Sequence, residues 1–412
     1  MIAEREQEQA VGLRQNKSFW LLLVSQAASV MGDQCWFVAL PWLVLELSGS
    51  SMSAGVTRAL EYVPYLLFSL IAGALLDRYN RRRMLVTIEI GRTITLLAIP
   101  FLALLGILET WQIFLLAFVL SSLDVFFNVG LLSVVPSIVP REHLTKANSY
   151  MESVFSLTAI LGLPLMGALV GVIGAPAVLG LDGLSFLFSL AVLLILRFPS
   201  PAPRETRLSF RALSSDIGAG LGFIWHHRVM RSIALLNFLG NLANSSLLIL
   251  SIVYLKEVLH LPAEVLGIVL ALSAFGTFLG ASNNPRIVKR LGHGNTVVLG
   301  FVLGVIPFIF YCFSDNWLLL GVGQFTFGLA LILINTNTNV IRQTLVPPEM
   351  MGRVTGAAST LARFSLPLGY FGAGLLAEIK GVENVLLIGL GLRLVLIGVA
   401  GFSPLRNFWI KK

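Results

Sequence analysis

Long apolar runs and short polar segments alternate along this chain. Twelve of the apolar runs approach the roughly 20 residues that cross a hydrocarbon core about 30 Å thick as a helix. We therefore predict an all-α integral membrane protein with twelve transmembrane helices. The predicted helices cover residues 18–47, 53–76, 84–105, 111–135, 148–172, 176–196, 232–254, 265–285, 296–313, 317–340, 354–377 and 385–402.

Lysine and arginine are distributed unequally between the segments that join these helices. Of the 29 residues, 23 fall on one side of the twelve-helix topology, two fall in loops of the other side, and four lie inside spans. Cytoplasmic loops carry the excess of positive charge, so both termini are predicted to be cytoplasmic, in an inner or plasma membrane. The first 17 residues lack the apolar core of a cleavable signal peptide, so the first span is expected to direct insertion.

Composition agrees with this class. The chain is 56% hydrophobic and 12% charged, whereas soluble domains contain about 25% charged residues. A net charge of +8 would suggest nucleic acid in a soluble protein, but here the cations flank membrane spans and no nucleic-acid partner is expected. Cys35 and Cys312 lie far apart in apolar runs, so the sequence predicts no disulfide and no metal site. No cofactor is predicted either.

A charged segment separates the second and third predicted helices. Residues 73–83 read GALLDRYNRRR, which resembles the loop signature of the major facilitator superfamily. The family usually has glycine where Asn80 stands, a position at which asparagine also tolerates left-handed backbone. The alternative is a positively charged loop without a mechanical role. The resemblance implies a cytoplasmic gate that holds the two halves together in the outward-facing state, formed by Gly73, Asp77, Arg78, Arg81 and Arg82.

An internal repeat supports the same resemblance. Residues 139–146 align with residues 346–353 at an offset of 207, about half the chain, and the same offset carries Gly162 onto Gly369 and Asp77 onto Asn284. Two parallel six-helix repeats are the plan of this superfamily, with the site between them near the midplane. The predicted organisation is a cytoplasmic tail at 1–17, a six-helix bundle at 18–197, a cytoplasmic linker with an interfacial amphipathic helix at 198–231, a second six-helix bundle at 232–405 and a cytoplasmic tail at 406–412.

Local strings resemble one branch of the superfamily, which contains macrolide and multidrug exporters, the enterobactin exporter and lysophospholipid transporters. They are ALPWLV at 39–44, VP at 139–140 running into ANS at 147–149, and DGLSF at 182–186. Residues 162–167 partly match a glycine-proline signature associated with antiporters. Close helix packing by small residues is an alternative reading of these glycines, and the two are compatible.

Ionisable side chains inside spans are costly, so each is a functional candidate. They concentrate in the first half of the chain. Arg58 and Glu61, and likewise Glu89 and Arg92, are three residues apart on one helix face, which predicts intramembrane ion pairs or functional groups.

Asp33 and Asp124 lack a cation on their own helices. The resemblance places the first and fourth helices beside the central cavity, where a desolvated carboxyl group can take up and release a proton. We predict proton coupling by these two residues, with Glu61 and Glu152 as further candidates; a structural or substrate-pairing role is the alternative. Asp182 and Arg393 fall on helices that the fold places at the periphery and are interpreted as structural.

Amide and aromatic side chains supply candidate substrate contacts. Asn237, Asn241 and Asn244 are spaced so that they share one helix face, although hydrogen bonding between helices is an alternative role for each. Few fixed cations favour a bulky amphipathic or cationic substrate over a small anion, which would call for paired arginines. The candidates are Gln34, Trp36, Phe37, Asn128, Asn237, Asn241, Asn244, Asn335 and Asn339.

Together these features predict a secondary active transporter that works by alternating access, with proton-coupled efflux of an amphipathic small molecule such as a drug or siderophore. Alternatives are a lysophospholipid or lipid flippase, an importer, or, less favoured, a non-transporting membrane receptor. The sequence contains no nucleotide-binding glycine loop, so ATP-driven transport is not expected. It contains no clustered nucleophile or metal set, so an enzyme is not expected either. The expected partners are the small-molecule substrate, protons and membrane lipid, and we expect a monomer.

Overall fold

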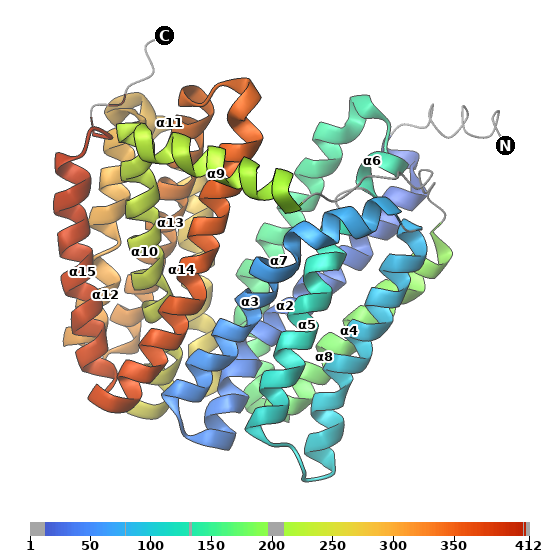
Figure 1. Cartoon of the computed structure of the whole chain (residues 1–412). Coiled ribbons are helices and arrows are strands. Elements are labelled where there is room, and N and C mark those ends of the chain that lie inside the picture. Colours follow the sequence, from blue (N-terminus) through green and yellow to red (C-terminus); the bar gives the residue numbers. More distant parts are fainter. Residues whose placement is uncertain (1–12, 79, 132–133, 197–209, 407, 409–412) are drawn as a thin grey trace. The chain divides into compact units, whose positions relative to one another are not determined.

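The fold is helical throughout the part of the chain that the structure describes (Figure 1). The structure is a computed structural model, and it describes residues 13–78, 80–131, 134–196, 210–406 and 408. The long helices are α2 (Lys17–Ser48), α3 (Ser51–Arg78), α4 (Arg81–Leu104), α5 (Thr110–Leu131), α7 (Leu144–Ile173), α8 (Ala175–Ile195), α9 (Phe210–His226), α10 (Arg228–Val253), α11 (Ala263–Leu303), α13 (Trp317–Leu345), α14 (Met351–Lys380) and α15 (Val382–Phe402). Shorter elements are η1 (Leu13–Gln15), α6 (Val135–Ile138), η2 (Arg141–His143), the π-helical η3 (Tyr254–Val258), α12 (Ile306–Phe313) and η4 (Pro348–Met350).

The prediction of twelve spanning helices is confirmed. By length and hydropathy, nine continuous helical stretches of the described residues can cross a membrane. One of these, Ala263–Phe313, contains two predicted spans, because Gly292 adopts φ 77° and breaks the helical backbone inside α11. The remaining two spans are α3 and α14, whose 28 and 30 residues exceed the roughly 20 that a crossing requires.

The chain forms two compact units. The first contains Met1–Leu43 and Val63–Leu208, and the second contains Val44–Tyr62 and Ser209–Lys412. These units are defined by contacts, whereas the domain boundaries predicted above follow the sequence repeat, and those boundaries stay a prediction.

Two helices belong to both units. α2 passes from the first unit to the second after Leu43, and α3 passes back after Tyr62. Each helix contains one proline close to its crossing point, Pro41 in α2 and Pro64 in α3.

Each unit has its own apolar core. In the first unit α4 packs against α8 and α5, and side chains such as Phe19, Leu22 and Leu85 are fully buried. In the second unit α11 packs against α13, and α10 packs against α14 and α15, around Val297, Phe301 and other buried side chains. Lipid is as apolar as these side chains, so van der Waals packing, and not the hydrophobic effect, determines which side of each apolar helix faces inward.

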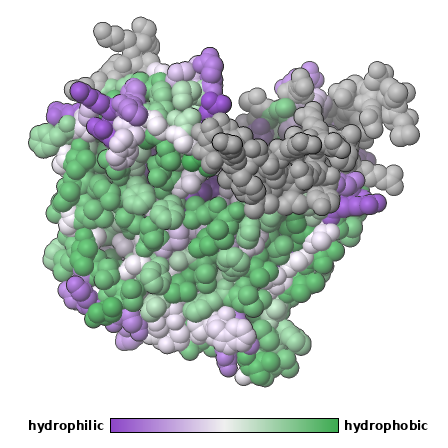
Figure 2. All heavy atoms as spheres, viewed as in Figure 1, coloured by the Kyte–Doolittle hydropathy of each residue, from purple (hydrophilic) through white to green (hydrophobic). Residues whose placement is uncertain are grey.

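The outward faces of the helices are apolar as well. Figure 2 shows hydrophobic residues covering the helical faces in that view, with hydrophilic residues gathered near the helix ends. Large apolar side chains are freely exposed, among them Leu104, Val172 and Phe402. Exposed apolar surface of this extent is unstable in water and suits contact with lipid.

Glycine permits the close approach of α11 and α13. A Cβ atom at Gly328 of α13 would collide with the backbone oxygen of Ser273 on α11, and one at Gly276 would collide with the backbone oxygen of Phe325. Small residues at such positions let helix backbones approach closely in membranes.

The helix predicted in the linker is present as α9. Ile224 is buried against the second unit, whereas Trp225 on the next position is largely exposed. His227 caps the following helix, because its Nδ1 accepts a hydrogen bond of 3.4 Å from the backbone nitrogen of Met230. The proline-containing segment at 199–203 lies outside the described residues, and the interfacial placement of α9 stays a prediction.

Candidate functional site

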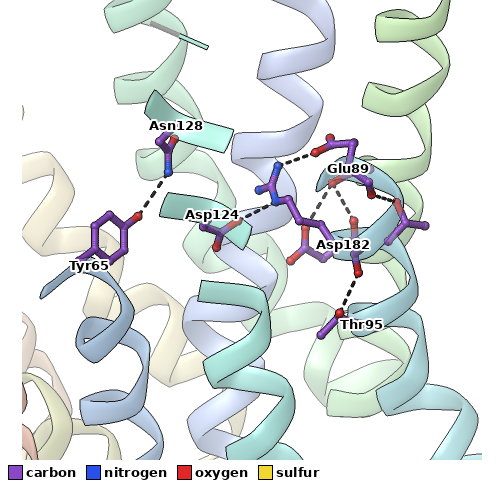
Figure 3. Close-up of polar contacts among 10 residues, drawn as sticks. Tyr65, Glu89, Thr95, Asp124, Asn128 and Asp182 are labelled. Atoms are coloured by element: carbon purple, nitrogen blue, oxygen red, sulfur yellow. Dashed lines mark hydrogen bonds and ion pairs between the residues drawn. The ribbon is translucent and has the colours of Figure 1, made fainter. Parts of the chain in front are cut away.

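The first unit contains a guanidinium group held between two carboxylates. Nη1 of Arg92 on α4 lies 2.8 Å from Oε2 of Glu89, one helical turn earlier. Nε of Arg92 lies 2.6 Å from Oδ1 of Asp124 on the neighbouring helix α5. Figure 3 shows Glu89 and Asp124 approaching the guanidinium from different directions. Arg92 therefore joins two helices through one buried cation.

Two aromatic rings enclose the same guanidinium. The central carbon of Arg92 lies 4.4 Å from the ring centroid of Phe127 and 3.8 Å from that of Phe186. An arginine over an aromatic face gains a cation–π attraction, and more so where water is excluded. These rings keep the ion pairs of Arg92 in a medium of low dielectric constant, where charge interactions are strong.

Two further carboxyl groups belong to this cluster. Asp33 on α2 interacts electrostatically with Arg92, Asp124 and Glu89. Asp182 on α8 is fully buried and interacts with Asp33 and Arg92. We call Asp33, Glu89, Arg92, Asp124 and Asp182 the acidic cluster.

Short-range packing fixes the position of Asp182. Its Oδ1 accepts a hydrogen bond of 3.2 Å from the hydroxyl of Ser185, and its Oδ2 has no hydrogen-bond partner among the described residues. Gly32 of α2 allows this contact, because a Cβ atom there would collide with Asp182 Oδ1 and Ser185 Oγ. The glycine next to Asp33 thus brings α2 and α8 together at the cluster.

The acidic cluster has four carboxyl groups for one guanidinium. A buried charge without a partner is expensive, so one cation cannot offset four carboxylates. Access to the members differs: Asp33 is exposed and the Asp124 side chain is 26% exposed, whereas the side chains of Glu89 and Asp182 are fully buried. The accessible carboxyl groups of Asp33 and Asp124 can accept protons, and the buried carboxyl groups of Glu89 and Asp182 can stay close to the charge of Arg92.

The remaining proton-coupling candidates are not members of the acidic cluster. Glu61 pairs with Arg58 at 2.8 Å within the second unit. Glu152 is exposed on α7, and no described residue forms an ion pair with it. The structure therefore brings together Asp33 and Asp124, but not Glu61 or Glu152.

Sequence reasoning missed two features of this cluster. It found the Glu89–Arg92 spacing but not the pair between Arg92 and Asp124, which lie on different helices. It also did not place Asp182 beside Asp33 and Arg92, whereas its interpretation of Asp182 as structural stays a prediction. The spacing of Asp182 and Ser185 was visible, but the approach of Gly32 to them depends on tertiary structure.

Most side chains of the predicted cytoplasmic gate lie outside the described residues. The backbone of α3 includes Gly73, Asp77 and Arg78, but their side chains and that of Arg81 lie outside the described residues. The gate therefore stays a prediction.

The side chains of three residues of the same segment are described, Asn80, Arg82 and Arg83. Arg82 donates hydrogen bonds from Nε to the carbonyl oxygen of Leu196 at 3.0 Å and from Nη2 to that of Leu194 at 2.5 Å. It therefore binds the free carbonyls at the end of α8, a favourable place for a cation. Asn80 caps α4, because its Oδ1 accepts a hydrogen bond of 3.1 Å from the backbone nitrogen of Arg83.

The second unit contains a cavity of 140 Å³ that we call the amide cavity. It includes four of the predicted substrate contacts, and Asn241 Nδ2 donates a hydrogen bond of 3.2 Å to the carbonyl of Ala362 at its edge. Asn244 does not line the cavity; it is buried and accepts a hydrogen bond from Arg393. The lining residues are Ile224, Met230, Ile233, Ala234, Asn237, Asn241, Asn335, Thr338, Asn339, Arg342, Ala358, Ser359 and Ala362.

The other substrate candidates belong to the first unit. Gln34 is partly buried on α2, as are Trp36 and Phe37. Asn128 on α5 is exposed and donates a hydrogen bond of 3.3 Å to the hydroxyl of Tyr65 (Figure 3). Across the described ranges, no group of three His, Cys, Asp or Glu side chains is placed to hold a metal ion.

Comparison with known proteins places these features in context. The sequence profile of the Major Facilitator Superfamily matches residues 22–370. The chain is 28% identical over 397 residues to the multidrug efflux pump Tap of Mycolicibacterium fortuitum, covering 93% of this chain and 95% of that protein. It is 21% identical over 397 residues to macrolide efflux protein A of Streptococcus pyogenes, covering 94% of this chain and 96% of that protein.

Solved structures share the fold. The nucleoside transporter NupG superimposes with a TM-score of 0.78 at 15% identity, covering 95% of this chain and 100% of the other. A bacterial homologue of the iron transporter ferroportin superimposes with a TM-score of 0.72 at 19% identity, covering 97% of this chain and 100% of the other. At these identities the likeness concerns the fold alone.

Proposed function

This chain belongs to the major facilitator superfamily and is a transporter, and from that premise we propose that it exports amphipathic small molecules in exchange for protons. Relatives that cover nearly the whole chain are a multidrug efflux pump and a macrolide efflux protein, which supports export of a small molecule across the cell membrane. We further propose that the protein acts as a monomer with both termini in the cytoplasm.

The acidic cluster is the observation that carries the proton-coupling proposal. Its four carboxyl groups exceed the single charge of Arg92, so a proton bound at Asp33 or Asp124 lowers the uncompensated charge. In the proposed cycle, proton binding from one side favours one conformation, and release on the other side follows when access alternates. The interior carboxylates of Glu89 and Asp182 then hold the Arg92 side chain in place.

The substrate is proposed to engage amide and aromatic groups in each half. In the second unit the amide cavity offers neutral polar groups beside the apolar side chains of Met230 and Ile233. A surface that combines amides with apolar walls suits an amphipathic molecule. Lipid flipping is a second candidate, because it would use the same amphipathic surface.

The test is substrate-driven proton movement in proteoliposomes. Wild type is compared with Asp33→Asn, Asp124→Asn and the double variant, using lipophilic cations, macrolides, siderophores and lysophospholipids as substrates. We expect the wild type to move protons when substrate is added, and the double variant to lose this response. Glu349→Gln, at an exposed position outside the acidic cluster, is the control and should behave as wild type.

Two outcomes would contradict the proposal. Substrate movement without proton movement would identify a facilitator or lipid carrier. Proton coupling that persists in the double variant would remove Asp33 and Asp124 from the coupling site.

A further inference from the structure

We propose that the amide cavity is a binding subsite for an oxyanion, a carboxylate or phosphate carried by an amphipathic molecule, with Arg342 as its cationic contact. The proposal deepens the proposed function by giving the chemical class of one substrate group. Binding at this site does not require that transport be coupled to protons.

Arg342 is the first reason. It lies in the last turn of α13 and lines the cavity. Its Nε is buried and has no hydrogen-bond partner among the described residues, and no carboxylate lines the cavity. A buried donor on a guanidinium without an acceptor is costly, so the site is incomplete without an acceptor from elsewhere. The planar fork of arginine matches a carboxylate or phosphate.

The amides are the second reason. Asn237, Asn335 and Asn339 line the cavity, and within the described residues none of their side-chain amides has a hydrogen-bond partner. Asn241 differs, because its amide nitrogen is occupied by the carbonyl of Ala362. Each free amide can donate two hydrogen bonds, so the oxygens that Arg342 does not reach have donors available.

Size and shape narrow the ligand further. The cavity volume is 140 Å³, and a cavity of about 150 Å³ holds one benzene molecule. The cavity therefore admits one head group or one ring, and not a whole macrocycle. The apolar side chains of Ile224, Met230 and Ile233 also line it. An oxyanion attached to an apolar body fits this mixed polar and apolar lining, and the body can belong to a transported compound or to a membrane lipid.

Equilibrium binding with small water-soluble probes tests the chemistry. The full-length protein is reconstituted in nanodiscs of phosphatidylcholine, and phenyl phosphate, benzoate and benzamide are titrated by saturation-transfer NMR. Benzamide has the size of benzoate without its charge. We expect benzoate and phenyl phosphate to bind at least tenfold more tightly than benzamide.

Variants assign the binding to Arg342. Arg342→Gln should weaken the anions at least tenfold and leave benzamide unchanged, and Arg342→Lys should retain part of the affinity because it keeps the charge but not the fork. Arg290→Gln, which removes an exposed arginine on α11, is the matched control and should bind as wild type. Equal affinity for benzoate and benzamide, or unchanged anion affinity in Arg342→Gln, would overturn the proposal.

A second arm identifies the source of the oxyanion. If a lipid phosphate occupies the site, adding phosphatidylglycerol to the nanodiscs should weaken phenyl phosphate binding to wild type and stabilise wild type but not Arg342→Gln against heat. If a transported molecule supplies it, phosphatidylglycerol should have the same effect on both. Anion binding with no proton-coupled transport would overturn the proposed function while leaving the site intact.

Discussion

At the scale of single residues, Arg92 is the cation of the acidic cluster and contacts two helices. It contacts Glu89 on its own helix and Asp124 on α5, and two aromatic rings cover it. Removing one partner of a buried ion pair leaves the other charge uncompensated. Because Arg92 has several partners, its loss is expected to affect more than one helix.

We predict that Arg92→Gln lowers the stability of the protein by about 3–5 kcal/mol, the cost typical of breaking a buried pair on one side. The same variant should lose substrate-dependent proton movement. Thermal unfolding of the purified protein and proton flux in proteoliposomes measure the two effects.

Arg92→Lys is the informative companion. It keeps the charge but cannot donate from the arginine fork, so we expect intermediate stability. Wild-type stability in Arg92→Gln would show that the acidic cluster does not need the cation.

At the scale of elements, glycine determines how closely α11 and α13 pack. Gly328 faces the backbone of Ser273, and the hydroxyl of Thr277 donates a hydrogen bond of 3.3 Å to the carbonyl of Gly328. Backbone atoms cannot move aside as a flexible side chain can, so this contact leaves no room for a methyl group.

We predict that Gly328→Ala destabilises the second unit by about 1–3 kcal/mol, the usual cost of overpacking. Gly398→Ala in α15 is the matched control, because a Cβ atom there meets nothing within 4 Å. Alanine is the better helix former, so the control should be neutral or slightly more stable. Thermal unfolding of both variants decides the matter, and equal melting temperatures would contradict the assigned contact.

Helix positions could be predicted from the sequence because hydropathy and length determine membrane spans. The predicted 111–135 and 176–196 correspond to α5 and α8 within a few residues. The break at Gly292 falls in the polar segment 286–295, between the predicted helices 265–285 and 296–313. The interruption between the end of α11 at Leu303 and the start of α12 at Ile306 was not predicted, since residues 296–313 form one apolar run.

At the scale of the whole molecule, the sequence could indicate pairs on one helix but not contacts between helices. Arg58 with Glu61 is visible as a spacing of three, whereas Arg92 with Asp124 depends on how α4 and α5 pack. For the same reason, the three asparagines predicted to share one face of a helix have different surroundings. Asn237 and Asn241 line the amide cavity, but Asn244, about 10 Å further along the helix than Asn237, contacts Arg393 instead.

The two helices that belong to both units have a mechanical consequence. Two of the three points at which the chain passes between the units lie inside α2 and α3, near Leu43 and Tyr62, so a change in the relation of the units is expected to bend these helices. Pro41 and Pro64 lie close to these points, and a proline in a helix interior removes a backbone hydrogen bond and weakens the helix there. We predict that Pro41→Ala and Pro64→Ala leave the fold intact but reduce substrate turnover in proteoliposomes.

Pro100→Ala is the control, because Pro100 lies inside α4, within the first unit. If all three variants turn over substrate equally fast, the crossing points are not hinges. If Pro41→Ala and Pro64→Ala are slower, α2 and α3 act as elastic hinges. The bending stiffness of these two helices would then limit the transport rate.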